Sequence, residues 1–156
     1  MTAHRGDRRT TTGARAALPG VLIGVGLAGT LDEVVLHQLL RWHHFYDRST
    51  SAVGLISDGL FHAASTAALA VGFVILIRRL GELPRGWGAP LVGWILVGAG
   101  GFNLYDGTIQ HKVLGLHQVR SGARSLLVYD VAFIGVAAVV ALAGVALLRG
   151  RPRAGG

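Results

Sequence analysis

The most restrictive feature of this sequence is a series of four apolar runs, at about residues 18–40, 53–77, 89–112 and 126–148. Each is close to the roughly 20 residues that an α-helix needs to cross about 30 Å of hydrocarbon. Backbone groups inside a bilayer must find their hydrogen bonds within the segment, so helices are the expected structure. The sequence therefore predicts an all-α membrane protein whose four transmembrane helices form a bundle.

Composition supports this class of protein and sets the domain boundaries. Hydrophobic residues make up 51% of the chain and charged residues 15%, as in a membrane protein. The first apolar run lacks the small-residue cleavage site of a signal peptide, so it is expected to be a retained anchor. We predict a basic cytoplasmic tail at residues 1–17, a transmembrane domain at 18–148 and a second basic tail at 149–156. The absence of cysteine excludes disulfides and thiolate ligands from this chain.

The net charge of +7 is distributed by loop rather than over one soluble face, which argues against nucleic-acid binding. Ten basic residues lie in the two tails and the middle loop: Arg5, Arg8, Arg9, Arg15, Arg78, Arg79, Arg85, Arg149, Arg151 and Arg153. The other two loops carry five: Arg41, Arg48, Lys112, Arg120 and Arg124. By the positive-inside rule, both termini are cytoplasmic and the protein is a multi-pass protein of the plasma (inner) membrane.

An internal repeat links the two halves of the transmembrane domain. The matching pairs, each 74 residues apart, are Asp32 with Asp106, His37 with His111, and His43 with His117. Asp58 and Asp130 match more weakly, 72 residues apart. The repeats cover about residues 20–77 and 90–148, so each is a hairpin of two spans. Two hairpins that enter the membrane in the same direction predict a pseudo-two-fold axis along the membrane normal.

Polar side chains gather in the outer half of the predicted bundle. A helical rise of about 1.5 Å per residue places His37, Asp58, His111 and Asp130 in one layer, with His62 deeper. Asp32 and Asp106 are expected about two turns below that layer, and His43, His44 and His117 at a surface rim. Asp32 and His37, five apart, would point about 140° apart around an α-helix. A buried carboxylate costs several kcal/mol unless it is paired, protonated or bound to a cation, so this concentration of polar groups indicates a site.

The sequence predicts that this site binds a transition-metal ion, because inward-facing carboxylates and imidazoles on neighbouring helices are typical metal ligands. The first candidates are His37, His62, His111 and Asp58. Asp130, Asp32 and Asp106 are further ligands or acceptors that fix the imidazole tautomers. His43, His44 and His117 complete the candidate set. Nitrogen and oxygen donors without sulfur favour Zn, Fe or Cu, and the role would be metal handling or metal-dependent redox chemistry at the outer face.

The stretches "LDEVVLHQLLRWHHF", "DGLFHA" and "FNLYDGTIQHKVLGLHQVR" resemble the bacterial predicted-membrane-protein family known as domain of unknown function 2243. The similarity extends from about residue 20 to 148 and implies a four-span membrane protein, but no activity. In the family's pattern the position of Glu33 is usually Gly, so Glu33 is left out of the predicted ligand set. The family's gene surroundings imply respiratory or metal-handling membrane proteins as partners.

Three other interpretations of these residues remain open from the sequence. Paired histidines on different helices, such as His37 and His111, could hold haem b in an electron carrier. A chain of intramembrane Asp and His residues could relay protons or ions. The same residues could also be interhelical hydrogen-bond partners with no further role. The expected surroundings are the lipid bilayer, and the glycine-rich helices leave a homo-oligomer open.

Overall fold

The computed structural model describes residues 4–83 and 85–150, and every regular element in this part of the chain is helical. The four long helices are α1 (His4–Asp32), α2 (Ser51–Arg79), α3 (Gly88–Tyr105) and α4 (Leu126–Arg149). Two π-helices extend α1 and α3, namely η1 (Glu33–Leu39) and η3 (Asp106–Val113), and a short 3-10 helix η2 (Leu80–Glu82) follows α2. α1 begins at His4, so the helix continues into the segment predicted as a tail, while 1–3 and 151–156 lie outside the described residues.

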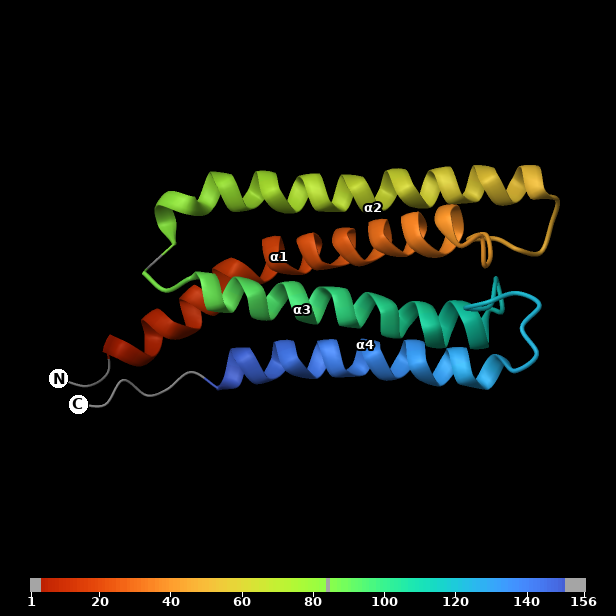
Figure 1. Cartoon of the computed structure of the whole chain (residues 1–156). Coiled ribbons are helices and arrows are strands. Elements are labelled where there is room, and N and C mark those ends of the chain that lie inside the picture. Colours follow the sequence, from red (N-terminus) through yellow and green to blue (C-terminus); the bar gives the residue numbers. More distant parts are fainter. Residues whose placement is uncertain (1–3, 84, 151–156) are drawn as a thin grey trace.

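Three helical segments are long and apolar enough to cross a membrane: Ala14–Leu39, Ser51–Glu82 and Leu126–Arg149. They correspond to the first, second and fourth apolar runs of the sequence. α3 covers the third run and lies alongside the other helices (Figure 1). It is not among these three, since its many glycines and Asn103 dilute its hydropathy. A membrane protein with several apolar helices is therefore established, and the fourth span stays a prediction.

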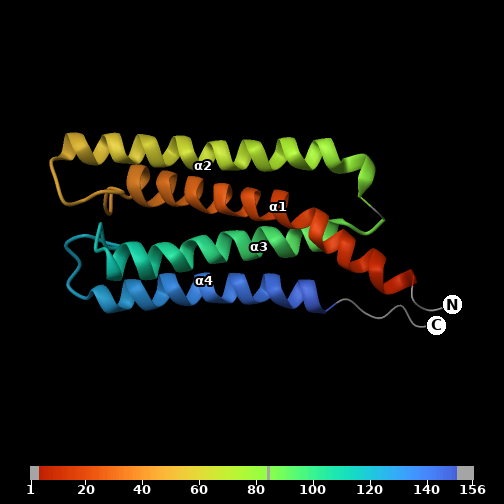
Figure 2. The ribbon, with the colours of Figure 1, turned by 180° about the vertical axis from the view of Figure 1, so that it is seen from behind.

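The long helices are arranged in the order α2, α1, α3, α4 (Figures 1 and 2). α1 packs on both α2 and α3, and α4 packs on α3, whereas the described parts of α2 and α4 have no comparable contact with each other. The four helices of the predicted bundle thus form an open row with α1 and α3 at its centre. Close packing there depends on glycine: a Cβ on Gly24 would lie 2.1 Å from the carbonyl oxygen of Ile95, and one on Gly98 2.5 Å from that of Val21.

The outer helices leave most of their apolar surface uncovered. Leu55, Ile56 and Leu60 of α2 and Leu127 and Val131 of α4 each expose more than half of their surface. In water such surfaces would be costly, whereas lipid tails solvate them as well as a protein interior does. The interior of the row holds the polar groups instead, including Glu33, His37, Asp58, Asp106 and His111. This distribution suits a protein embedded in a bilayer.

Both π-helices lie at the same end of the row, opposite the ends where α1 begins and α4 finishes (Figure 1). At that end a loop connects η1 to α2 and another connects η3 to α4. α2 begins at Ser51 and is capped by Thr50, whose hydroxyl accepts a hydrogen bond from the Val53 amide. The beginnings of α2 and α4 are therefore brought beside the ends of α1 and α3, where the acidic and histidine residues occur.

Candidate metal centre

The π-helices bring together side chains that an α-helix would separate. In a π-helix the backbone amide of residue i+5 bonds to the carbonyl of residue i, so side chains five positions apart stack on one face. Asp32 Oδ2 lies 3.4 Å from His37 Nε2, and Asp106 Oδ2 lies 2.9 Å from His111 Nε2. The prediction of about 140° between Asp32 and His37 is wrong, because it assumed that α-helical geometry continues to the end of the segment.

The chain reverses immediately after each π-helix. Arg41 and Gly115 both adopt left-handed backbone conformations, with φ of 52° and 57°. This turn sends the next residues back toward the helices instead of outward to the surface. His43 and His117 are consequently only 4% and 3% exposed, so placing them on a surface rim was wrong. His44 is half-buried and also faces the interior cluster.

The tautomers of His43 and His117 follow from their hydrogen bonds. Nδ1 of His43 donates to the carbonyl of Val119 at 2.9 Å, and Nδ1 of His117 donates to the carbonyl of Phe45 at 2.8 Å. Since a carbonyl oxygen can only accept, each Nδ1 carries a proton, and in a neutral ring Nε2 then holds a lone pair. Both Nε2 atoms are buried and make no hydrogen bond. Burial, reinforced by the neighbouring imidazoles, lowers the pKa of His43 to about 3, which keeps it neutral.

These two histidines converge with His111. One ring nitrogen of each of His43, His111 and His117 lies within 4.8 Å of the others, and both nitrogens of His111 are buried without a hydrogen bond. Asp106 adjoins this group, with Oδ2 2.9 Å from Nε2 of His111 and Oδ1 3.6 Å from Nε2 of His117. We call His43, His111 and His117 the histidine cluster. Its buried lone pairs with no hydrogen-bond donor facing them are what a metal ion requires.

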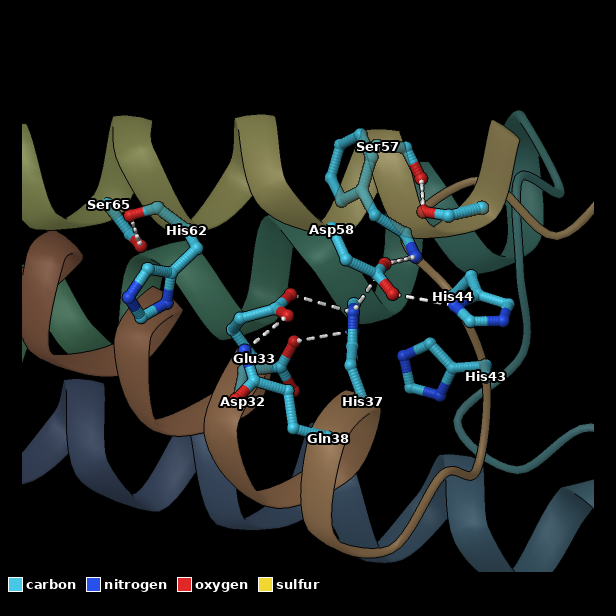
Figure 3. A network of polar contacts seen from close by, with 12 residues as sticks. Asp32, Glu33, His37, Gln38, His43, His44, Ser57, Asp58, His62 and Ser65 are labelled. Carbon is cyan, nitrogen blue, oxygen red and sulfur yellow. Dashed lines mark hydrogen bonds and ion pairs between the residues drawn. The ribbon is translucent and has the colours of Figure 1, made fainter. Parts of the chain in front are cut away.

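A second group lies next to it on the side of α2 (Figure 3). Nδ1 of His37 is 2.9 Å from Oε2 of Glu33 and 3.0 Å from Oδ1 of Asp58. These three side chains, which we call the carboxylate cluster, come from η1 and α2 and are all buried. The rings of His37 and His43 are 4.4 Å apart between centroids, so the two clusters adjoin.

Residues 19–151 match the family described as predicted membrane protein (DUF2243). The chain belongs to this family. No curated protein and no solved structure matches it. The DUF2243 match confirms the resemblance inferred from the sequence motifs, and it covers both π-helices and all four long helices apart from the beginning of α1.

The DUF2243 chain brings most of the predicted site residues together. Six of them belong to at least one of three groups of potential metal ligands: His37, Asp58, His111, His43, His117 and Asp32. Besides the two clusters, the third group is Asp32, His37 and His43. Asp106 and His44 contact these groups directly. The remaining two candidates lie apart among the described residues: Asp130 forms an ion pair with Lys112 at 2.5 Å, and His62 belongs to none of the three groups.

Three further residues of the site were not selected from the sequence. Glu33 is fully buried and faces His37, a pairing that its spacing of four positions from His37 signalled. Gln110 is buried and donates to Asp106 Oδ1 at 2.8 Å. Lys112 forms an ion pair with Asp130 at the edge of the site. Gln110 has the same four-position spacing from its partner Asp106, whereas the sequence offered no such signal for Lys112, because its contact with Asp130 depends on the packing of α4.

A pocket of about 950 Å³ opens onto the carboxylate cluster. Its wall includes Glu33, His37 and Asp58, with Arg41 and Trp42 from the loop after η1. The volume is that of a small-molecule site. The carboxylate cluster is thus reachable from outside the protein.

Proposed function

We propose that this protein binds a transition-metal ion in the histidine cluster, at the end of the helices where η1 and η3 lie. The observation that carries the proposal is the pair of hydrogen bonds from Nδ1 of His43 and His117 to backbone carbonyls. Metal-binding histidines usually donate their second ring nitrogen to a carbonyl or carboxylate, which fixes the tautomer and aims the free lone pair. His43 and His117 are both held in this way, and their Nε2 atoms are buried beside His111 without a hydrogen bond.

The donor set narrows the choice of ion. His43, His111 and His117 would hold the ion. Asp106 would orient His111 through its Nε2 and, being near Nε2 of His117, could be a further ligand. Neutral imidazoles suit Zn, Cu or Fe, and such an ion supplies Lewis acidity or, for Cu and Fe, one-electron chemistry. The residues of the chain would fix the imidazoles and exclude water, while the adjacent pocket would admit a partner molecule.

Duplication of a two-helix hairpin accounts for the arrangement of this end of the protein. The Asp47 amide donates to the Leu116 carbonyl and the Ser121 amide to the Trp42 carbonyl, both at 3.0 Å. The two donors are 74 residues apart, and so are the two acceptors, so each bond is the repeat of the other. The bonds from His43 and His117 are related in the same way. Such reciprocal bonds support a pseudo-two-fold axis between α1 and α3, with α3 as a fourth span.

The same arrangement supports one orientation in the membrane. The start of α1, the end of α4 and the α2–α3 connection lie together, opposite the candidate site (Figure 2). The predicted excess of basic residues belongs to those segments, so they would face the cytoplasm and the metal site would face the outer side of the plasma membrane.

The alternative functions fit this geometry less well. Four imidazole rings form a continuous row, His37, His43, His117 and His111, with neighbouring centroids 4.4, 4.6 and 4.4 Å apart. The rings of His43 and His117 therefore fill the space in which a haem between His37 and His111 would have to lie. A proton relay along this row would need ring-to-ring hydrogen bonds, but Nδ1 of His43 and of His117 is already bonded to a carbonyl.

Metal analysis of the purified protein tests the proposal. Protein isolated in detergent without a chelator or a His tag should contain Zn, Cu or Fe, and His43→Ala and His117→Ala should each lose one equivalent per chain. His62→Ala is the matched control, because it removes a half-buried histidine outside the three groups. Equal metal content in all four proteins, or wild-type protein that takes up no metal on reconstitution, would refute the assignment.

A further inference from the structure

The carboxylate cluster has the separations of a second metal site. His37 Nδ1 approaches Glu33 Oε2 at 2.9 Å and Asp58 Oδ1 at 3.0 Å. Two ligand atoms at right angles around an ion, each bound at about 2.1 Å, are about 3.0 Å apart. The two distances from His37 Nδ1 therefore suit adjacent ligands of one small cation, and one ligand atom of each of the three residues lies within 4.8 Å of the others.

Hydrogen bonding within the protein does not account for this approach. Nδ1 of His37 can carry one proton, and its hydrogen bond is to Asp58 Oδ1 at 3.0 Å. Glu33 Oε2, in a side chain that is fully buried, is left without a hydrogen-bond donor. A buried ionised oxygen that accepts no hydrogen bond is costly, so a cation beside it would stabilise it.

The opposite end of each side chain is held by a separate contact (Figure 3). Glu33 Oε1 accepts a hydrogen bond from Gln38 Nε2 at 3.1 Å, and Asp58 Oδ2 accepts one from His44 Nδ1 at 2.6 Å. His37 Nε2 faces Asp32 Oδ2 at 3.4 Å. These outer contacts orient Glu33 Oε2, Asp58 Oδ1 and His37 Nδ1 toward one another, as the outer contacts of metal ligands commonly do.

The balance of charge also calls for a cation. Three carboxylates, Asp32, Glu33 and Asp58, surround two imidazoles, His37 and His44. With all three carboxylates ionised, one negative charge would remain in a buried region even if both imidazoles were protonated. A divalent cation bound to neutral His37 removes this excess, and it adds the strongest attraction available to buried carboxylates.

The second half of the chain has a lysine near the position that corresponds to the carboxylate cluster. The residues 74 positions after Glu33, Gln38 and His44 are Gly107, Lys112 and Gln118. Lys112 Nζ lies 2.5 Å from Asp130 Oδ2 and donates to Gln118 Oε1 at 2.9 Å. Gly107 has no side chain, so this half lacks the carboxylate that Glu33 supplies. A larger residue there would be crowded, because an added Cβ would lie 3.0 Å from Phe133 and Ile134. An ammonium group thus neutralises Asp130, whereas the first half has no lysine or arginine paired with Asp58 among the described residues.

We propose that Glu33, His37 and Asp58 form a second metal site, separate from the histidine cluster, that takes a divalent cation of the Mn²⁺ or Fe²⁺ type. Two carboxylate oxygens and one imidazole nitrogen are harder donors than three imidazoles, and they favour these ions. Because the pocket opens onto the cluster, the remaining coordination positions are accessible to water or to a small anionic molecule. The protein would then hold two unlike ions on adjoining sites.

Mn²⁺ binding followed by electron paramagnetic resonance tests this site, with metal-stripped full-length protein in detergent. Wild type should bind one Mn²⁺ per chain, and Glu33→Gln should weaken binding at least about tenfold. Asp58→Asn should do the same, and it provides a second variant if Glu33→Gln fails to fold. Glu82→Gln is the control, since it removes an exposed carboxylate at the other end of α2 and should leave Mn²⁺ binding unchanged.

His117→Ala separates this site from the histidine cluster. It should retain Mn²⁺ while losing the metal assigned to the histidine cluster. The second site is refuted if wild type binds no Mn²⁺, if Glu33→Gln and Asp58→Asn bind it as wild type does, or if His117→Ala abolishes it. In the last case, a single ion in the histidine cluster would explain both measurements.

Discussion

Gly24 in the middle of α1 should be intolerant of even one added methyl group. A Cβ added at this position would lie 2.1 Å from the Ile95 carbonyl oxygen and 2.8 Å from the Ala99 amide nitrogen, both in the backbone of α3. Since ordinary contact begins at 3.4 Å, α1 and α3 would have to separate by roughly 1.3 Å. Overpacking of this kind costs about 1–3 kcal/mol, and a rigid backbone on both sides places Gly24→Ala at the upper end.

Helix propensity partly offsets this cost, which makes a matched control necessary. Gly→Ala within a helix gains about 1 kcal/mol, so the net loss of unfolding free energy in Gly24→Ala should be about 2 kcal/mol. Gly135 of α4 has open space where an added Cβ would lie, and Gly135→Ala should therefore gain about 1 kcal/mol. The two alanine variants should differ by about 3 kcal/mol.

The assay is reversible unfolding of the purified protein in mixed micelles, followed by circular dichroism for wild type and both variants. Metal content should be measured on the same samples, because α1 and α3 also carry the two π-helices that position the histidine cluster. Equal unfolding free energies for Gly24→Ala and Gly135→Ala would refute direct backbone packing between α1 and α3.

Two further predictions concern the turns and the orientation of the protein. Arg41 and Gly115 both have left-handed backbones, which favour glycine. Arg41→Gly should therefore raise the unfolding free energy by about 0.5–1 kcal/mol, and Gly115→Ala should lower it by about 1 kcal/mol. A loss of stability in both variants would contradict this. The chain has no cysteine, so single thiols report its topology: an impermeant maleimide should label Ser49→Cys in intact cells and Gly81→Cys only after lysis. The reverse pattern would invert the proposed orientation.

Several properties of this protein follow from local sequence and could be predicted without the structure. Long apolar runs specify membrane-spanning helices, because a bilayer leaves the backbone no partner outside its own segment. Acidic and histidine residues within such runs are costly when isolated, which marked Asp32, His37, Asp58 and His111 as members of a site. The DUF2243 match supports the membrane class inferred from these patterns.

The same patterns could not determine which polar groups meet. Asp32 and His37 pair because η1 is π-helical, and the choice between α and π geometry depends on packing at the helix end rather than on the local residues alone. Asp130 was grouped with the ligands on depth along its helix, but the contact with Lys112 depends on where α4 packs against η3. Depth gives a position along the membrane normal and leaves the direction of each side chain undetermined.

The sequence by itself thus determined the membrane class, the helices and the concentration of charge near one end of them. Only the tertiary structure decided that the helices form an open row, that His43 and His117 turn inward, and that Glu33 joins His37 and Asp58. The physical reason is the range of the interactions involved. Burial in lipid and helix formation act over neighbouring residues, whereas the histidine and carboxylate clusters are assembled from η1, η3, the two adjoining loops and α2 by contacts between distant segments.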